Sequence, residues 1–157
     1  MATAVAEAAP RLLVDRQRRV IDYLRISVTD RCNYRCTYCM PEEGAEAAAR
    51  ADVLSFDEIV ALARAFVTLG VRRLRLTGGE PTVRRDLPTL ARRLRELPGV
   101  DELSLSTNGD RLAALATPLR AAGVDRLNVS LDTLDAAKFA RITGRGDLAR
   151  VLAGLEA

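Results

Sequence analysis

All three cysteines of the chain lie within eight positions, in the segment CNYRCTYC. They are Cys32, Cys36 and Cys39, spaced C-x3-C-x2-C, and the 157-residue chain contains no histidine. Thiolates are soft ligands that bind zinc or the iron of iron–sulfur clusters. The residue type and its spacing therefore predict a metal or redox site that is held by a single loop.

A structural zinc ion, a disulfide framework and a redox pair each explain these cysteines incompletely. Structural zinc requires four nitrogen or sulfur ligands, and the chain offers three thiols and at best a carboxylate such as Asp30. Disulfide frameworks are typical of secreted proteins with an even number of cysteines. A redox pair formed by Cys36 and Cys39 leaves Cys32 without a role.

A cube of four irons suits three thiolates better. Each iron of the cube takes one external ligand, so three cysteines leave one iron open to a molecule that is not protein. An electron carrier has no use for an open position, whereas an enzyme requires it for substrate or cofactor. The number of cysteines therefore favours chemistry at the cluster over simple electron transfer.

The cysteine loop belongs to a chain that repeats a short alternating strand followed by a helical segment. Strands are expected over 23–28, 71–77, 102–107 and 125–131, and helices over 55–69, 86–97, 111–122, 135–141 and 147–157. Ser55 and Glu58 form a capping box that begins the first helix, and Gly70 ends it. Strands that alternate with amphipathic helices predict parallel β/α units with right-handed crossovers.

Each expected strand has one apolar and one polar face. In the second strand, Leu74 and Leu76 alternate with Arg73, Arg75 and Thr77. Parallel strands are usually apolar on both faces, so a shared polar face indicates the lumen of a barrel that holds a ligand. A sheet with solvent on one side is the alternative. The predicted fold is α/β, a partial parallel β/α barrel of about four β/α units.

Composition argues against two classes of partner. The net charge of +3 and the sequence pI near 9.0 would suit nucleic acid, but the basic residues are scattered among acidic ones, and only three Tyr and three Phe are available to stack on bases. The Ala-rich beginning of the chain has no apolar run long enough for a signal peptide, and no segment reaches the length of a membrane span. We therefore expect a cytoplasmic protein without a nucleic-acid or membrane partner.

The motif C-x3-C-x-Tyr-C, directly after a first strand, resembles the radical S-adenosylmethionine superfamily, whose barrels are similar to TIM barrels. The resemblance implies a 4Fe–4S cluster on Cys32, Cys36 and Cys39, with S-adenosylmethionine on the open iron. It also implies that Tyr38 lies against the adenine, and that the GGEP turn (78–81) pairs its backbone with the methionine amino group. One electron from the cluster then splits a C–S bond of the cofactor and releases a 5′-deoxyadenosyl radical.

Five longer segments are similar to one family of this superfamily, the GTP 3′,8-cyclases of molybdenum cofactor biosynthesis, which convert GTP to 3′,8-cyclo-7,8-dihydro-GTP. The segments are LRISVTDRCNYRCTYCMP (24–41), RLTGGEP (75–81), RRDL (84–87), STNG (106–109) and NVSLD (128–132). The resemblance implies that Gly79 and Ser130 contact S-adenosylmethionine. It implies GTP contacts at Arg25, Arg75 and Ser106, where the family usually has Thr. It assigns no catalytic side chain, because the cluster and S-adenosylmethionine carry the radical chemistry, and it adds an electron donor as a partner.

The resemblance covers only part of the family's length. Full-length members have a C-terminal half with further cysteines for a second 4Fe–4S cluster and a Gly-Gly tail, which this sequence lacks. We therefore expect an N-terminal arm (1–20) and a truncated radical S-adenosylmethionine core domain (21–157). An unpaired edge on the fourth strand predicts marginal stability, aggregation, a homodimer or a separate C-terminal half, unless the chain is a fragment of a longer gene product.

Other functions stay open from the sequence. Arg25 or Arg75, taken without the family, would fit an ordinary ion pair equally well. A different radical S-adenosylmethionine enzyme would use the same barrel. A fragment that binds the cluster and S-adenosylmethionine without cyclase activity, and a small zinc- or nucleic-acid-binding protein, are the alternatives from other classes.

Overall fold

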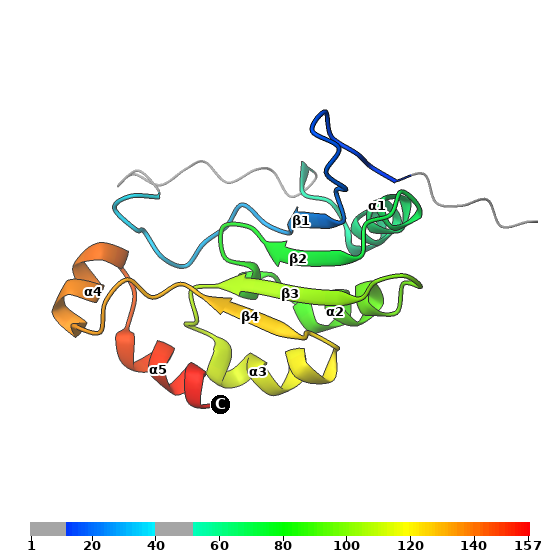
Figure 1. The fold of residues 1–157 in the computed structure, drawn as a ribbon. Coiled ribbons are helices and arrows are strands. Elements are labelled where there is room, and N and C mark those ends of the chain that lie inside the picture. Colours follow the sequence, from blue (N-terminus) through cyan, green and yellow to red (C-terminus); the bar gives the residue numbers. More distant parts are fainter. Residues whose placement is uncertain (1–11, 40–51) are drawn as a thin grey trace, which may run out of the picture.

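The computed structural model of the chain describes residues 12–39 and 52–157, and within them four parallel strands form one sheet in the order β1-β2-β3-β4. The strands are β1 (Tyr23–Ser27), β2 (Arg73–Thr77), β3 (Glu102–Thr107) and β4 (Arg126–Val129). The helices are α1 (Phe56–Thr68), the 3-10 turn η2 (Pro81–Val83), α2 (Leu87–Arg95), α3 (Leu112–Ala121), α4 (Ala136–Thr143) and α5 (Leu148–Glu156). The predicted α/β fold of four parallel β/α units is confirmed (Figure 1).

Local sequence signals set both ends of α1. The Ser55 hydroxyl accepts a hydrogen bond from the Glu58 N–H (3.2 Å), and the Glu58 carboxylate accepts one from the Ser55 N–H (2.7 Å). This reciprocal pair is the predicted capping box. Gly70 follows the last turn with a φ of 95°, in the left-handed region where a side chain is disfavoured.

The apolar face of the sheet packs against α1, α2 and α3 in one hydrophobic core. Four strand leucines are fully buried there: Leu74, Leu76, Leu103 and Leu105. On the opposite face, Arg75 lies beside its register partner Ser104, and the Arg75 Nε donates a hydrogen bond to the Ser104 hydroxyl (3.2 Å). The alternation in the sequence therefore separates an apolar row from a polar row, as predicted.

The fourth strand is shorter than predicted. The sequence predicts a strand over 125–131, whereas β4 ends at Val129 and has β3 as its one neighbour in the described sheet. Leu127 is 40% exposed, although its register partner Leu105 is buried. A strand with a single neighbour lacks the second row of hydrogen bonds that would extend its ladder, which accounts for the early end.

The difference in burial between these two register partners predicts a difference in stability. Leu105→Ala should lower the free energy of unfolding by about 3 kcal/mol, because it removes buried apolar surface and leaves a cavity. Leu127→Ala is the matched control and should cost about 1 kcal/mol or less, since its side chain already meets solvent. Urea denaturation followed by circular dichroism measures both, and equal losses would contradict the assigned burial.

Residues 12–21 form a short turn that lies against α1. Val14 and Val20 form an antiparallel bridge, and the Leu13 N–H donates to the Leu69 carbonyl (3.1 Å). The predicted boundary between the arm and the core domain falls beside this turn and stays a prediction. Residues 1–11 and the last two residues of the segment 24–41, Met40 and Pro41, lie outside the described residues. None of the helices in the described part of the chain combines the length and the apolarity needed to cross a bilayer.

Candidate functional site

The carboxyl ends of the strands bring the predicted motifs to one edge of the sheet. The cysteine loop follows β1, the GGEP turn follows β2, the STNG segment ends β3 and Ser130 follows β4 (Figure 1). Parallel strands direct their carboxyl ends to the same edge, which is where open α/β sheets bind ligands. Segments that lie far apart in the sequence therefore meet at one candidate site.

The three cysteines are free thiols on the loop after β1. Cys32 and Cys36 are partly buried, and Cys39 is exposed. Burial raises the pKa of Cys32 and of Cys36, and the charge of neighbouring thiols raises both further. The Tyr34 N–H donates a hydrogen bond to the Cys32 sulfur (3.4 Å) and acts in the opposite direction on its pKa. All three thiols are thus available on the one loop that follows β1.

This set of donors fits a four-iron cube better than a single ion. Among residues 12–39 and 52–157, no three His, Cys, Asp or Glu side chains converge on a position that would hold a metal ion. A cube makes a different demand, because each thiolate binds its own iron. Three free thiols on one loop, in a chain with no fourth cysteine, match that demand.

The glycine turn after β2 contacts the beginning of the cysteine loop. The Gly79 N–H donates to the Thr29 carbonyl (2.7 Å), and the Glu80 N–H donates to the Arg31 carbonyl (2.8 Å). A Cβ at Gly79 would lie 2.4 Å from the Arg31 carbonyl oxygen and 2.6 Å from that of Asp30. Only glycine allows two backbones to approach this closely, so the turn fixes the path on which the loop leaves β1.

Glu80 is a buried carboxylate that joins this turn to the end of β3. The residue is 2% exposed. Its oxygens accept hydrogen bonds from the Thr107 hydroxyl (2.7 Å), the Asn108 N–H (2.7 Å), and the hydroxyl (2.5 Å) and N–H (3.0 Å) of Thr82. A buried carboxylate is tolerated when several donors satisfy it. From the sequence, a role was predicted for the glycines of the GGEP motif. The structural role of Glu80 was not predicted.

Removal of this carboxylate should destabilise the fold. Glu80→Ala is expected to lower the free energy of unfolding by about 2–4 kcal/mol, because buried donors on Thr107 and Asn108 lose their acceptor. Glu58→Ala is the control, since it removes an exposed carboxylate that caps α1, and its effect should be smaller. Thermal and urea denaturation measure both variants. A loss in Glu80→Ala no greater than that in Glu58→Ala would contradict the assigned role.

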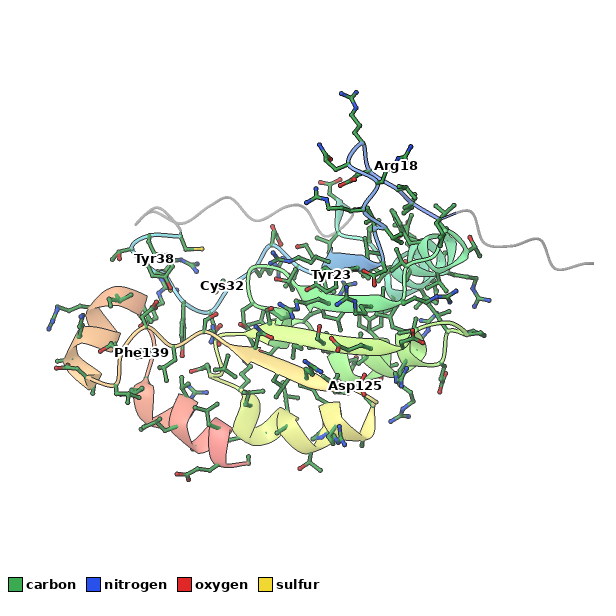
Figure 2. All side chains as sticks on the ribbon, in the orientation of Figure 1. Arg18, Tyr23, Cys32, Tyr38, Asp125 and Phe139 are labelled. Atoms are coloured by element: carbon green, nitrogen blue, oxygen red, sulfur yellow. The ribbon has the colours of Figure 1, made fainter. Side chains whose placement is uncertain are left out.

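The cysteine loop also packs against the segment that follows β4. A second hydrophobic cluster consists of Tyr34, Phe139, Leu148 and Val151, with Cys32 and Cys36 packed against it. The Tyr34 ring meets the Phe139 ring edge-on, with centroids 6.2 Å apart, and the Arg35 N–H donates to the Thr143 carbonyl (2.9 Å). Figure 2 shows Phe139 on α4 beside the loop that carries Cys32 and Tyr38. Helices α4 and α5 therefore support the loop from the side away from β2.

The residues predicted to contact S-adenosylmethionine lie around this edge. Tyr38 is 67% exposed, and its hydroxyl donates a hydrogen bond to the Asp132 carboxylate (2.9 Å). Ser130 lies just beyond β4, where its N–H donates to the Thr107 carbonyl (2.9 Å). Gly79 is in the turn described above. The structure thus brings these residues and the cysteines to the same edge, and their contacts with the cofactor stay predictions.

The residues predicted to contact GTP lie on the polar face of the sheet. Arg25 and Arg75 are register partners on β1 and β2. The Arg75 guanidinium lies 5.5 Å from the centre of the Tyr23 ring. In the part of the chain that the structure describes, neither arginine forms an ion pair with a carboxylate. Ser106 is half-buried on β3. The alternative of an ordinary ion pair therefore finds no support in the described residues.

The comparison with known families decides the class of protein. Residues 26–157 match the family model described as the radical SAM superfamily. The chain belongs to the radical SAM superfamily. Membership implies a 4Fe–4S cluster and S-adenosylmethionine as cofactors, in agreement with the cysteine motif. It argues against a small zinc-binding or nucleic-acid-binding protein.

The curated proteins that this radical SAM chain resembles include GTP 3′,8-cyclases from two bacteria. The one from Ectopseudomonas mendocina is 55% identical over 145 residues, and the one from Pseudomonas fluorescens is 52% identical over 147 residues. These matches cover 92% and 94% of this chain but 44% of each relative. The chain therefore spans less than half the length of the curated relatives that it matches.

A solved structure supports the fold independently. Methylornithine synthase superposes with a TM-score of 0.62 at 16% sequence identity, over 85% of this chain and 40% of the other. At that identity the likeness concerns the fold alone. It agrees with a partial barrel similar to a TIM barrel.

Proposed function

We propose that this radical SAM chain is the cluster- and S-adenosylmethionine-binding part of a GTP 3′,8-cyclase of molybdenum cofactor biosynthesis. The observation that carries the proposal is the meeting of the cysteine loop, the GGEP turn and Ser130 at one sheet edge, beside a polar face with two adjacent arginines. The identity of 55% and 52% to proteins named GTP 3′,8-cyclase supports the same substrate.

The side chains at the sheet edge have binding and orienting roles in this proposal. The thiolates of Cys32, Cys36 and Cys39 hold the cluster, which supplies one-electron chemistry together with S-adenosylmethionine when both are bound. Gly79 would contact the methionine end of the cofactor through its backbone, and Tyr38 would contact the adenine. The hydrogen bond from the Tyr38 hydroxyl to the Asp132 carboxylate orients the ring.

The two arginines suit the triphosphate of GTP. A guanidinium group stays protonated at any working pH and pairs with phosphate oxygens through its fork of N–H donors. Arg25 and Arg75 are neighbours across the β1–β2 register, so this face of the sheet offers two cationic side chains to an anion. Ser106, on the same face, offers a hydroxyl to the nucleotide.

The proposed function also requires an electron donor, a suitable cellular location and the remaining part of the GTP site. Reduction of the cluster requires a donor of electrons, which the sequence does not identify. A cytoplasmic location suits free thiols and a reduced cluster, because the cytosol keeps thiols reduced. The rest of the GTP site would come from a C-terminal half, either in the same gene product or as a separate chain, or from a second copy of this chain.

Anaerobic reconstitution tests the proposed reaction. The chain is loaded with iron and sulfide, reduced with dithionite, and given S-adenosylmethionine with and without GTP. We expect 5′-deoxyadenosine, formed faster when GTP is present, and a cyclised GTP product when the C-terminal half is supplied. S-adenosylmethionine cleavage that ignores GTP would instead indicate a cluster-binding fragment without cyclase activity. Stoichiometric zinc bound in place of iron would contradict the proposal that the chain is part of a radical SAM enzyme.

A variant pair makes the test specific to the substrate. Arg75→Ala should weaken GTP binding by about tenfold or more, because a charge-assisted hydrogen-bonded pair with phosphate is lost. Arg73→Ala is the control on the same strand face, since Arg73 already pairs with Asp22 (2.7 Å) and should leave GTP affinity nearly unchanged. Isothermal titration with GTP measures both. Equal affinities for the two variants would argue against the assigned GTP face.

A further inference from the structure

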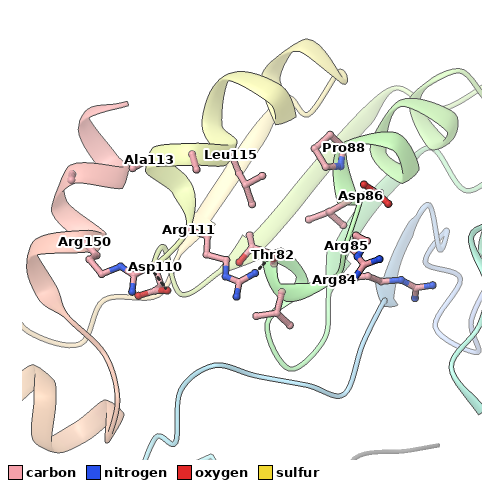
Figure 3. Close-up of a pocket in the computed structure, with 14 residues that line it drawn as sticks. Thr82, Arg84, Arg85, Asp86, Pro88, Asp110, Arg111, Ala113, Leu115 and Arg150 are labelled. Carbon is pink, nitrogen blue, oxygen red and sulfur yellow. Dashed lines mark hydrogen bonds and ion pairs between the residues drawn. The ribbon is translucent and has the colours of Figure 1, made fainter. Parts of the chain in front are cut away.

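Asp110 lies at the centre of a polar network that connects the cysteine loop with α5. It is 8% exposed and follows the STNG segment at the end of β3. Its Oδ2 accepts a hydrogen bond from the Asn33 Nδ2 (2.9 Å) and lies 3.3 Å from the Arg150 Nη2. Its Oδ1 accepts from the Tyr34 hydroxyl (3.5 Å). Figure 3 shows Asp110 and Arg150 side by side. Both residues line a cavity of about 610 Å³.

The two loop residues that donate to Asp110 directly follow the first cysteine. Asn33 is held on its other side as well, because its Oδ1 accepts a hydrogen bond from the Asn108 Nδ2 (2.9 Å). Tyr34 uses its hydroxyl for Asp110 and its backbone N–H for the Cys32 sulfur (3.4 Å). A change at Asp110 therefore reaches the Cys32 sulfur through one intervening residue.

Charge and burial explain why the loop adopts this conformation. A carboxylate with little exposure is costly unless donors surround it. For Asp110, the donors are one arginine of α5 and two side chains of the cysteine loop. A different loop conformation would withdraw Asn33 and Tyr34 and leave the carboxylate with Arg150 alone. The conformation that satisfies Asp110 is thus favoured before any cluster binds.

We propose that Asp110 is a positioning residue for the cluster, which acts through Asn33 and Tyr34 to hold the cysteine loop in its binding conformation. Ligand-orienting residues outside the direct ligands of a metal commonly change its affinity when they are removed. Asp110 has this relation to Cys32. The proposal rests on the cluster that superfamily membership implies, and it does not depend on GTP being the substrate.

Three variants test this role. Asp110→Ala removes the acceptor for both loop residues. Asn33→Asp places a second carboxylate against Asp110, so that two negative charges meet at hydrogen-bond distance. The double variant Asn33→Asp/Asp110→Asn exchanges the two groups: the new carboxylate at position 33 accepts from the new amide at position 110 and from Asn108. The exchange restores the direct contact between positions 33 and 110 with its polarity reversed, although Arg150 then faces an amide N–H instead of a carboxylate oxygen.

Cluster content and spectra provide the readout. After anaerobic reconstitution, Asp110→Ala and Asn33→Asp should each retain about tenfold less cluster iron and sulfide than the unmodified chain. The electron paramagnetic resonance spectrum of what remains should be broadened. The double variant should recover at least about half of the cluster content, because the Asn33 contact is restored. Thermal unfolding of the apo forms shows whether each variant is folded.

Two results would overturn the proposal. One is full cluster content with an unchanged spectrum in Asp110→Ala. The other is a double variant that binds no more cluster than Asn33→Asp, and this comparison remains decisive even where Asp110→Ala fails to fold. Asp57→Asn is the control, since it removes an exposed ion pair with Arg93 and should load normally. S-adenosylmethionine cleavage by the unmodified chain at a rate that GTP does not change would count against the proposed function alone. Normal cluster content in Asp110→Ala and Asn33→Asp would count against the role of Asp110 alone.

Discussion

Cys36→Ser is expected to reduce the iron bound after anaerobic reconstitution by more than about tenfold. A serine hydroxyl stays protonated near neutral pH and is a hard donor, so one iron of the cube would lose its ligand. Cys36 is partly buried against the hydrophobic side chains of Tyr34 and Phe139. Its backbone carbonyl accepts a hydrogen bond from the Cys39 N–H (2.9 Å). Iron and sulfide assays, together with the brown colour of the cluster, measure the loss.

The control for this variant lies on the same loop. Thr37→Ser changes an exposed residue between Cys36 and Cys39, and it keeps the backbone N–H that donates to the Ile142 carbonyl (2.9 Å). It should load the cluster normally. Because the chain has three cysteines and no histidine, serine at Cys32 or Cys39 should have the same effect as at Cys36. A brown, fully loaded Cys36→Ser chain would contradict the predicted ligands.

Gly79→Ala is expected to disrupt the same loop from the neighbouring strand. A Cβ at this position would lie 2.4 Å and 2.6 Å from the carbonyl oxygens of Arg31 and Asp30. Both atoms belong to backbone, so no flexible side chain can yield, and the start of the loop must move. We expect a loss of about 2–4 kcal/mol in the free energy of unfolding and about tenfold less cluster after reconstitution.

Gly70→Ala separates this clash from the general cost of replacing a glycine. Gly70 has a φ of 95°, and a Cβ there would meet the end of the Leu12 side chain, which can rotate away. The variant should lose about 1 kcal/mol of stability for the positive φ and should still load the cluster. Denaturation curves and iron content are compared for both variants. Equal cluster content would show that Gly79 does not set the path of the loop.

Local pattern was sufficient to predict much of the fold. Alternation in RLRLT places Leu74 and Leu76 in the core and leaves Arg75 on the polar face, because side chains on a strand alternate sides. The capping box at Ser55 and the glycine at position 70 were read from adjacent residues and were confirmed. The predicted site residues come together because parallel strands end at one edge.

Contacts between distant residues were not visible in the pattern. Asp110 meets Asn33 across 77 positions, and Glu80 meets Thr107 across 27. Periodicity shows which face a residue occupies but not which side chain lies opposite. One signal was available for Asp110, since polar residues directly after a parallel strand commonly belong to a site. The extent of β4 depends on which strands lie beside it, and in the described part of the chain β3 is its one neighbour.

Electron paramagnetic resonance of the reduced, reconstituted chain gives the most direct test of the cysteine site. Three thiolates in a chain without a fourth cysteine should hold a four-iron cube with one iron open to S-adenosylmethionine. We expect the signal of a reduced 4Fe–4S cluster and a clear change in that signal when S-adenosylmethionine is added. No such cluster, or a cluster signal that S-adenosylmethionine leaves unchanged, would contradict the assignment of this loop.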